Sequence, residues 1–259
     1  MTDLFSLKSK AVVIFGGAGY IGRTLTKAIL QQGGRVIVAD QNGEIFRQGE
    51  YAGLEGEGNF GFVPCNVAKA GEIRAAYEAC VGRYGFVNVM INLVAYGKFA
   101  DLAGQGDEDM AFSLDGVAGQ VFRTIREAIP YFKDRGGAIV TTASMYGIVS
   151  PDYRIYGTSG QNNPPVYGMG KAAVIQLTRY AAAHLAPMGI RVNSVSPGPV
   201  PDPGKNPPRD FMEQLAGKTM LGRVGKPEDM AGAFIYLISD ASAFTTGECI
   251  CVDGGWTKW

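Results

Sequence analysis

The chain has 259 residues, and its 24 Lys and Arg are balanced by 24 Asp and Glu, so the formal net charge is zero. This balance, with no run of basic residues, argues against a protein that binds nucleic acid. Four cysteines without a CxxC pair, and one histidine, offer no metal-ligand set, so no metal is expected. No apolar run approaches the roughly 18 residues of a membrane-spanning helix, and the N-terminus has no signal pattern. We therefore expect a cytoplasmic protein without membrane association.

Short apolar runs alternate with longer amphipathic segments along the chain. The expected strands are residues 11–15, 35–39, 60–65, 87–92, 138–142, 190–195 and 248–252. The expected helices between them are residues 21–32, 73–84, 110–132, 166–186 and 227–239. Continuous apolar strands suit a parallel sheet covered on both faces, and regular strand–helix alternation indicates a doubly wound topology. The prediction is a single Rossmann-like α/β domain over residues 1–259, with a seven-stranded parallel sheet flanked by helices.

The first strand runs into a glycine-rich turn. Gly16, Gly19 and Gly22 are spaced three apart, at the point where the first helix begins. Such a turn lets the backbone approach a pyrophosphate, and the helix N-terminus adds free N–H groups, here those of Tyr20, Ile21 and Gly22. Glycine-rich turns also occur for steric reasons alone.

The second strand ends in Asp40, 18 residues after Gly22. A carboxylate at this place accepts hydrogen bonds from the adenine ribose hydroxyls and repels a 2′-phosphate. Gln41 follows where an arginine would favour NADP, so NAD is the expected cofactor and NADP the less favoured one. The alternative for Asp40 is an ordinary turn residue, because Asn42-Gly43 comes next.

Two irregular stretches follow strands, at residues 150–165 and 197–209. In an open α/β sheet the loops after the carboxyl ends of the strands surround the ligand crevice, so both stretches are expected there. Between them, Tyr167 and Lys171 stand four residues apart on a predicted helix and therefore share a face. A nearby cation favours the phenolate of a tyrosine, whose pKa is ordinarily about 10, and makes it a usable acid or base. Ser144, after the fifth strand, would donate to a substrate oxygen.

In this order, the glycine turn, Asp40, Ser144 and the Tyr167/Lys171 pair resemble the short-chain dehydrogenase/reductase family. The resemblance covers nearly the whole chain and includes Asn193-Ser-Val-Ser-Pro197-Gly198-Pro-Val200, Gly222-Arg-Val-Gly-Lys-Pro227-Glu-Asp229 and Thr246-Gly247-Glu-Cys-Ile-Cys-Val-Asp253-Gly254-Gly255. It implies an enzyme that transfers a hydride between nicotinamide and a secondary alcohol or ketone, and a homodimer or homotetramer.

The resemblance also implies roles for single residues. Tyr167 would be the acid or base, Lys171 would lower the pKa of Tyr167 and bind the nicotinamide ribose, and Ser144 would polarise the substrate oxygen. Residues Pro197, Gly198 and Val200 would lie beside the nicotinamide, where the backbone around Val200 would hold its carboxamide.

Other positions match the family only in part. Asn66 and Val67 stand where the family's adenine-contacting Asp-Val usually occurs. After the fourth strand only Asn92 remains of the usual Asn-Asn-Ala-Gly. The family's catalytic Asn in the central helix is missing. One alignment puts Ser113 in its place, able to hold the water of a proton relay, and the other puts Val117 there, which is not.

Ser144 and Tyr167 are 23 residues apart, about ten more than is usual in the family. The extra residues carry many hydrogen-bonding side chains, among them Arg154 and Asn163, which we take as candidate substrate contacts. This favours a polyhydroxylated substrate such as a sugar, a polyol or an activated sugar. The alternative is a solvated loop or an oligomer contact, and an interface is also expected for Trp256 and Trp259.

Two other functions stay open. The GxxGxxG spacing is closer to that of nucleotide-sugar epimerases and dehydratases with tightly held NAD than to the usual dehydrogenase turn. The missing Asn suggests a non-catalytic dinucleotide sensor, although a sensor has no need of Ser144, Tyr167 and Lys171.

Overall fold

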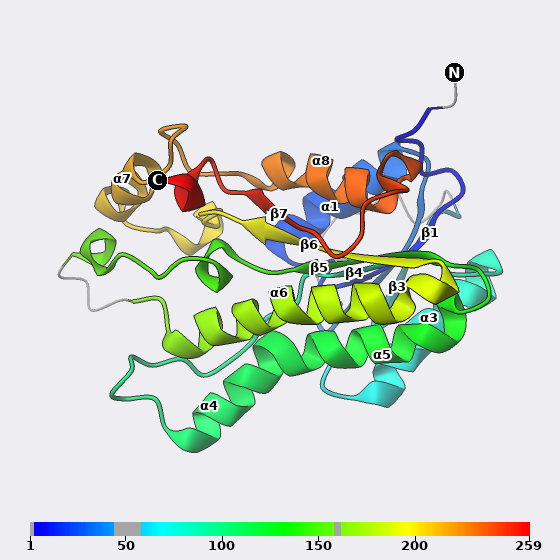
Figure 1. The fold of residues 1–259 in the computed structure, drawn as a ribbon, viewed down its shortest axis with the longest axis horizontal. Helices are drawn as coiled ribbons and strands as arrows, with labels where there is room; N and C mark the ends of the chain where they lie inside the picture. Colours follow the sequence, from blue (N-terminus) through cyan, green and yellow to red (C-terminus); the bar gives the residue numbers. More distant parts are fainter. Residues whose placement is uncertain (1–2, 44–57, 158–161) are drawn as a thin grey trace.

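All seven predicted strands are present in one parallel sheet (Figure 1). The computed structural model describes residues 3–43, 58–157 and 162–259. The strands are β1 (Ala11–Phe15), β2 (Arg35–Asp40), β3 (Phe60–Pro64), β4 (Val89–Asn92), β5 (Gly137–Thr142), β6 (Ile190–Pro197) and β7 (Cys249–Val252). Every residue of β1 and β4 is buried, as expected for continuous apolar strands covered on both faces.

The strand order is β3-β2-β1-β4-β5-β6-β7. The chain therefore winds away from β1 on one side and from β4 on the other. The last residues of these two neighbours, Phe15 and Asn92, are in register. At such a switch point the following loops diverge and leave a crevice for a ligand.

Helices cover both faces of the sheet (Figure 1). On one face lie α1 (Tyr20–Gln31) and α8 (Pro227–Ile238); on the other lie α3 (Ala70–Tyr84), α5 (Gln120–Phe132) and α6 (Pro165–Leu185). Two further helices, α4 (Asp107–Leu114) and α7 (Arg209–Gly217), extend toward the end of the molecule where the strands terminate. The predicted α/β fold is confirmed. None of the helices within the described ranges combines the length and apolar character needed to cross a membrane.

Alternate residues of the central strands pack into two separate cores. Val12 and Ile14 of β1 join the core under α1 and α8, whereas Val13 and Phe15 join the core under α3, α5 and α6. Burial of each such side chain stabilises the fold by about 1.5–3 kcal/mol. The two cores hold the carboxyl ends of β1, β4, β5 and β6 in fixed positions.

The helix expected at residues 110–132 is interrupted. A π-helical turn, Asp115–Gly119, separates α4 from α5. Its Gly116 carbonyl accepts a 3.2 Å hydrogen bond from the Tyr96 amide, so the segment before α4 lies directly on this turn. Two glycines within five residues weaken the regular helix here, and apolar periodicity does not reveal a single inserted residue.

Candidate active site

The glycine turn after β1 is shaped for close backbone contact. Gly16 has φ of +80°, a conformation that L side chains rarely adopt. A Cβ built on Gly22 would lie 2.5 Å from the Gly16 carbonyl oxygen, so only glycine lets α1 start this near the turn. The first hydrogen bond of α1 runs from the Arg23 amide to the Gly19 carbonyl at 3.0 Å. The amides of Tyr20, Ile21 and Gly22 precede it and point out of the helix end.

These amides border a pocket of about 760 Å³. Its lining also includes Thr142 at the end of β5 and Val200 after β6. The Thr142 hydroxyl is buried without a hydrogen-bond partner among the described residues. A glycine cradle, a helix N-terminus and an orphaned hydroxyl beside one pocket fit the pyrophosphate and nicotinamide half of a dinucleotide.

Asp40 lies beside a second pocket, of about 290 Å³, which the glycine turn also lines. One carboxylate oxygen accepts from the Ala18 amide at 3.0 Å and the other accepts from the Asn42 amide at 3.1 Å. Each oxygen keeps a lone pair for a ribose hydroxyl. The turn role and the ribose role proposed for Asp40 are therefore compatible.

The structure separates the two residues expected at the adenine. Val67 is 2% exposed and lines the smaller pocket. Asn66 closes a local turn: its Oδ1 accepts from the Ala68 amide at 2.9 Å, and its amide donates to Glu72 at 2.7 Å. The Asn66 side chain is thus used in the turn before α3, and the Asn66 backbone is tied to α3 through Glu72.

Asn92 is almost fully buried and serves the scaffold. Its Nδ2 donates to Gln120 Oε1 and to Thr124 Oγ1, both at 2.8 Å, and its Oδ1 accepts from the Val94 amide at 2.9 Å. Gln120 in turn donates to the Val94 carbonyl at 2.7 Å. Both polar atoms of the Asn92 side chain are used within the protein, so this side chain fixes the turn after β4 against α5, and its contacts do not support it as a cofactor ligand.

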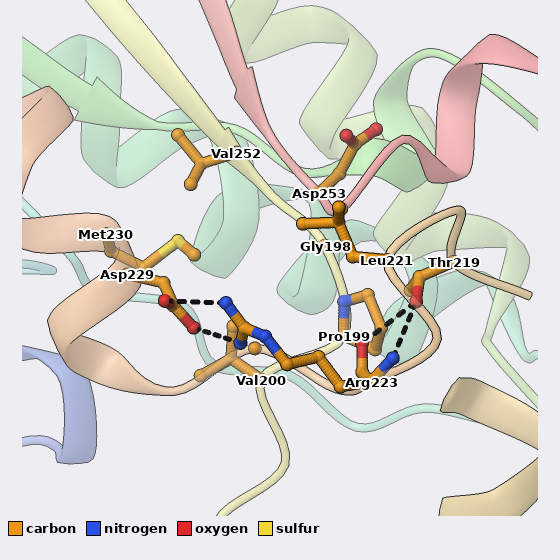
Figure 2. A pocket seen from close by; sticks show the side chains of 12 residues that line it. Gly198, Pro199, Val200, Thr219, Leu221, Arg223, Asp229, Met230, Val252 and Asp253 are labelled. Carbon is orange, nitrogen blue, oxygen red and sulfur yellow. Dashed lines mark hydrogen bonds and ion pairs between the residues drawn. The ribbon is translucent and has the colours of Figure 1, made fainter. Parts of the chain in front are cut away.

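The segment Pro197–Val200 is held at its backbone. The Gly198 amide donates to the Val252 carbonyl at 2.9 Å, and the Pro199 carbonyl accepts from the Gly225 amide at 2.8 Å. Figure 2 shows the pocket of about 200 Å³ behind this segment, where Arg223 and Asp229 form a two-pronged ion pair at 2.6 and 3.0 Å. This scaffold presents Val200 to both pockets that it lines.

Ser144, Tyr167 and Lys171 lie together at the carboxyl end of β5. Lys171 is 2% exposed; its ammonium donates to the Thr142 carbonyl at 2.6 Å and lies 5.6 Å from the centre of the Tyr167 ring. Burial lowers the pKa of Lys171 to about 8. Burial also raises the pKa of Tyr167, and a hydrogen bond with Ser144 opposes that rise. The expected lowering of the Tyr167 pKa by Lys171 stays a prediction.

Small residues bring these three side chains together. A Cβ on Gly147 would lie 2.7 Å from the Lys171 carbonyl carbon, so the turn after Ser144 touches the α6 backbone. A Cβ on Gly170 would lie 2.6 Å from Val117, which packs on α6 beside Lys171.

Ser113 does not take the place of the missing Asn in these contacts. Its buried hydroxyl accepts from the Lys98 amide at 2.9 Å and donates to the Lys98 carbonyl at 2.8 Å. Ser113 therefore holds the Lys98 backbone. Val117, the residue that the other alignment puts in the place of the missing Asn, packs against α6, the helix that carries Lys171.

The insertion between Ser144 and Tyr167 is fastened through its charged groups. Asp152 accepts from Arg154 Nε and Nη2, both at 2.8 Å, and forms an ion pair with Lys218 after α7. The Arg154 side chain is 86% exposed, and the Asn163 side chain donates a 3.4 Å hydrogen bond to the Pro164 carbonyl. These contacts do not support Arg154 as a substrate ligand; residues 158–161 lie outside the described ranges.

Several residues that contact the site were not predicted from the sequence. Phe99 packs edge-on against Tyr167, with ring centroids 6.3 Å apart. Tyr146 packs edge-on against Trp256, also at 6.3 Å, and Trp256 is 7% exposed. Trp256 is thus a core residue rather than the expected interface residue, whereas Trp259 is 73% exposed. In the sequence, only the position of Tyr146, two residues after Ser144, could have indicated that it lies near the site. The other contacts join segments that are far apart in the chain.

Comparison with known proteins gives one consistent result. The family model described as "Enoyl-(Acyl carrier protein) reductase" matches residues 17–257. A 3-oxoacyl-(acyl-carrier-protein) reductase of Thermotoga maritima is 34% identical over 96% of this chain and 98% of its own. A short chain dehydrogenase of Leptospira borgpetersenii with bound NAD+ is 30% identical, with a TM-score of 0.82 over 96% and 92% of the two chains. A gluconate 5-dehydrogenase of Burkholderia cenocepacia in complex with NADP and tartrate is 25% identical, with a TM-score of 0.87 over 99% and 98%.

Proposed function

The chain belongs to the short-chain dehydrogenase/reductase family, an NAD(P)-binding family of oxidoreductases that act on CH–OH groups, and we propose that it transfers a hydride between NAD and a secondary alcohol or ketone. The observation that carries the proposal is the grouping of Ser144, Tyr167 and Lys171 beside the larger pocket, where the Thr142 carbonyl holds the Lys171 ammonium.

Tyr167 is the group that exchanges a proton with the substrate oxygen. Ser144, already hydrogen-bonded to Tyr167, places a second donor at the same oxygen. The buried Lys171 ammonium favours the phenolate when Tyr167 releases its proton, because charges interact strongly in a low dielectric. The nicotinamide, when bound, supplies or accepts the hydride. Burial keeps bulk water away from Lys171, whereas Tyr167 is half-buried and stays accessible to a substrate.

We take NAD as the cofactor because of Asp40. Its two oxygens are held in place by backbone amides at the edge of the smaller pocket, and its negative charge opposes a 2′-phosphate. Similar proteins hold either NAD+ or NADP, so the preference rests on this side chain.

The polyhydroxylated substrate expected from the sequence loses its main support in Arg154, which pairs with Asp152 at the surface. Asn163 stays a candidate contact, since it lines a recess of about 310 Å³ with Tyr146 and Tyr153. A homodimer or homotetramer stays a prediction, with exposed Trp259 as a candidate interface residue.

The test is NADH formation from a panel of secondary alcohols, with Tyr167→Phe beside the parent. General acid–base catalysis contributes about 10²–10⁴-fold, so Tyr167→Phe should lower kcat/KM by at least about 100-fold. Tyr180→Phe is the matched control, because Tyr180 lies on the same helix, α6, and is 66% exposed. Activity that survives Tyr167→Phe contradicts the proposed role.

The same purified protein distinguishes the two alternative functions, an epimerase or dehydratase and a non-catalytic sensor, from the proposed dehydrogenase. An epimerase holds its NAD through turnover, so denatured protein would release a stoichiometric dinucleotide and no NADH would accumulate. A sensor would bind NADH but convert no member of the panel, whether or not Tyr167 is present.

A further inference from the structure

A two-pronged ion pair spans the π-helical turn between α4 and α5. Asp115, the first residue of that turn, accepts from both terminal nitrogens of Arg123, at 2.6 and 2.8 Å. The Arg123 side chain is 19% exposed. The hydrogen bonds from Arg123 hold the pKa of the Asp115 carboxyl below its ordinary value, so both groups are charged at neutral pH. Paired nitrogens and oxygens fix the geometry of such a contact more firmly than a single surface ion pair does.

The same two side chains hold two walls of the smaller pocket. Arg123 Nε donates to the Val67 carbonyl at 3.1 Å, and Asp115 accepts from the Tyr96 hydroxyl at 3.1 Å. Val67 follows β3 and Tyr96 follows β4, and both line the pocket of about 290 Å³ that Asp40 borders. In the sheet, β2 and β1 lie between β3 and β4, so no strand pairing fixes the separation of these two walls. The ion pair joins them directly.

Two glycines of the π-helical turn make room for this arrangement. A Cβ built on Gly116 would lie 2.5 Å from the Tyr96 ring, so glycine lets that ring lie directly on the turn. A Cβ built on Gly119 would meet the Asp115 carboxylate where it turns toward Arg123. Each glycine weakens a helix by about 1 kcal/mol relative to alanine. The turn thus gives up helix stability at the two positions where the wall and the ion pair need the space.

We propose, resting on the proposed function, that Asp115 and Arg123 are positioning residues for the adenine half of the dinucleotide, and that they hold Val67 and Tyr96 at the separation that the adenine ring fills. The adenine belongs in this pocket because Asp40, the side chain that we assign to the adenine ribose, borders it. Walls that are already in place bind a flat ring more tightly than walls that must be ordered on binding. Asp115 and Arg123 are not among the described residues that line the pocket, so they act through the two walls.

The test measures the two halves of the cofactor separately. Dissociation constants of ADP-ribose and of nicotinamide mononucleotide are determined by titration calorimetry for the parent and for Arg123→Met, which keeps an unbranched side chain but removes its hydrogen bonds. Arg123→Met should bind ADP-ribose about tenfold more weakly and change the dissociation constant of nicotinamide mononucleotide by less than about twofold. A general loosening of the fold would weaken both halves alike. Equal losses, or an unchanged affinity for ADP-ribose, would overturn the inference.

A second variant changes the same network without breaking the ion pair. Tyr96→Phe removes only the hydroxyl whose hydrogen bond Asp115 accepts. It should weaken ADP-ribose binding by about threefold in the parent, and by less than about 1.5-fold in a protein that already carries Asp115→Ala, because the hydroxyl then has lost its acceptor. Additive losses would contradict the role of Asp115.

Arg126→Met is the matched control on the same helix. Arg126 lies three residues after Arg123 on α5, and its guanidinium pairs with Glu127 at 2.8 Å. Its side chain is 50% exposed. Removing this guanidinium should change the affinity for each half of the cofactor by less than about twofold.

Failure of the proposed function gives a different result. If the parent binds ADP-ribose but oxidises no alcohol, a selective loss in Arg123→Met supports the positioning role while hydride transfer fails. If the parent oxidises alcohols with NAD but Arg123→Met weakens both halves alike, the positioning role fails and the proposed function stands. A parent that binds no ADP-ribose would reject both.

Discussion

The Lys171 ammonium donates a 2.6 Å hydrogen bond to the Thr142 carbonyl, two residues before Ser144. This bond joins α6 to the end of β5, and among the described residues it is the one hydrogen bond of this nearly inaccessible ammonium. A carbonyl offsets only part of the hydration that an ammonium loses on burial. The site thus keeps Lys171 charged at neutral pH at a cost in stability.

That cost predicts a pH dependence. Burial lowers the pKa of Lys171 to about 8 from its ordinary 10.5, so between these values the unfolded chain binds more protons at this residue than the folded one. Stability therefore rises with pH across the window, by roughly 3 kcal/mol at most. The measurement is urea unfolding of the parent and Lys171→Met at pH 7, 8, 9 and 10. The difference, parent minus variant, should increase with pH; a constant difference would contradict the buried charge.

A second prediction concerns Gly147, where the chain needs the absence of a side chain. The contact with the Lys171 backbone at 2.7 Å leaves no room for a methyl group, so Gly147→Ala must move Ser144 away from Tyr167. We expect a loss of about 1–3 kcal/mol in stability and at least about a tenfold fall in kcat.

Gly232→Ala is the control for Gly147→Ala. Gly232 lies on α8 with no atom within 4 Å of a built Cβ, so alanine should stabilise the protein by about 0.5–1 kcal/mol without changing kcat. Unchanged kcat in Gly147→Ala would show that Ser144 can be displaced without consequence.

The cofactor preference predicts a third result, at Asp40. The parent should bind NADH more tightly than NADPH in a fluorescence titration. Asp40→Asn keeps an oxygen for the Ala18 amide but removes the charge, so the ratio of the two dissociation constants should shift toward NADPH by about tenfold. Asp40→Ala additionally removes the turn contacts and should weaken both cofactors. Tighter NADPH binding by the parent would reverse the assignment.

Much of this site was predictable because its signals are local. The glycine spacing fixes the turn between β1 and α1, and a four-residue separation puts Tyr167 and Lys171 on one face of α6. Apolar runs of four to eight residues located all seven strands. Each of these patterns depends on residues that are close in the sequence, so it can be recognised without knowing the tertiary contacts.

The rest depended on pairings between distant segments. The side chain of Arg154 is of a type that often binds substrates. In the structure, however, its guanidinium pairs with Asp152, two residues earlier, and Asp152 also pairs with Lys218, which follows α7. Trp256 is of a residue type that is common at interfaces, yet in the structure it packs against Tyr146 in a core. Such contacts depend on how loops meet beyond the sheet, and no periodicity encodes that.

The last prediction decides between Ser113 and Val117. The Ser113 hydroxyl holds both polar atoms of the Lys98 backbone, so Ser113→Ala should cost about 1–2 kcal/mol of stability in urea unfolding. Because it is Val117, not Ser113, that packs against Gly170 on α6, kcat should stay within about twofold of the parent value. Ser150→Ala, at an exposed position whose hydroxyl donates a long 3.5 Å hydrogen bond to the Pro151 carbonyl, should change neither quantity. A tenfold or larger fall in kcat with unchanged stability would instead return Ser113 to the proton relay that the sequence allowed.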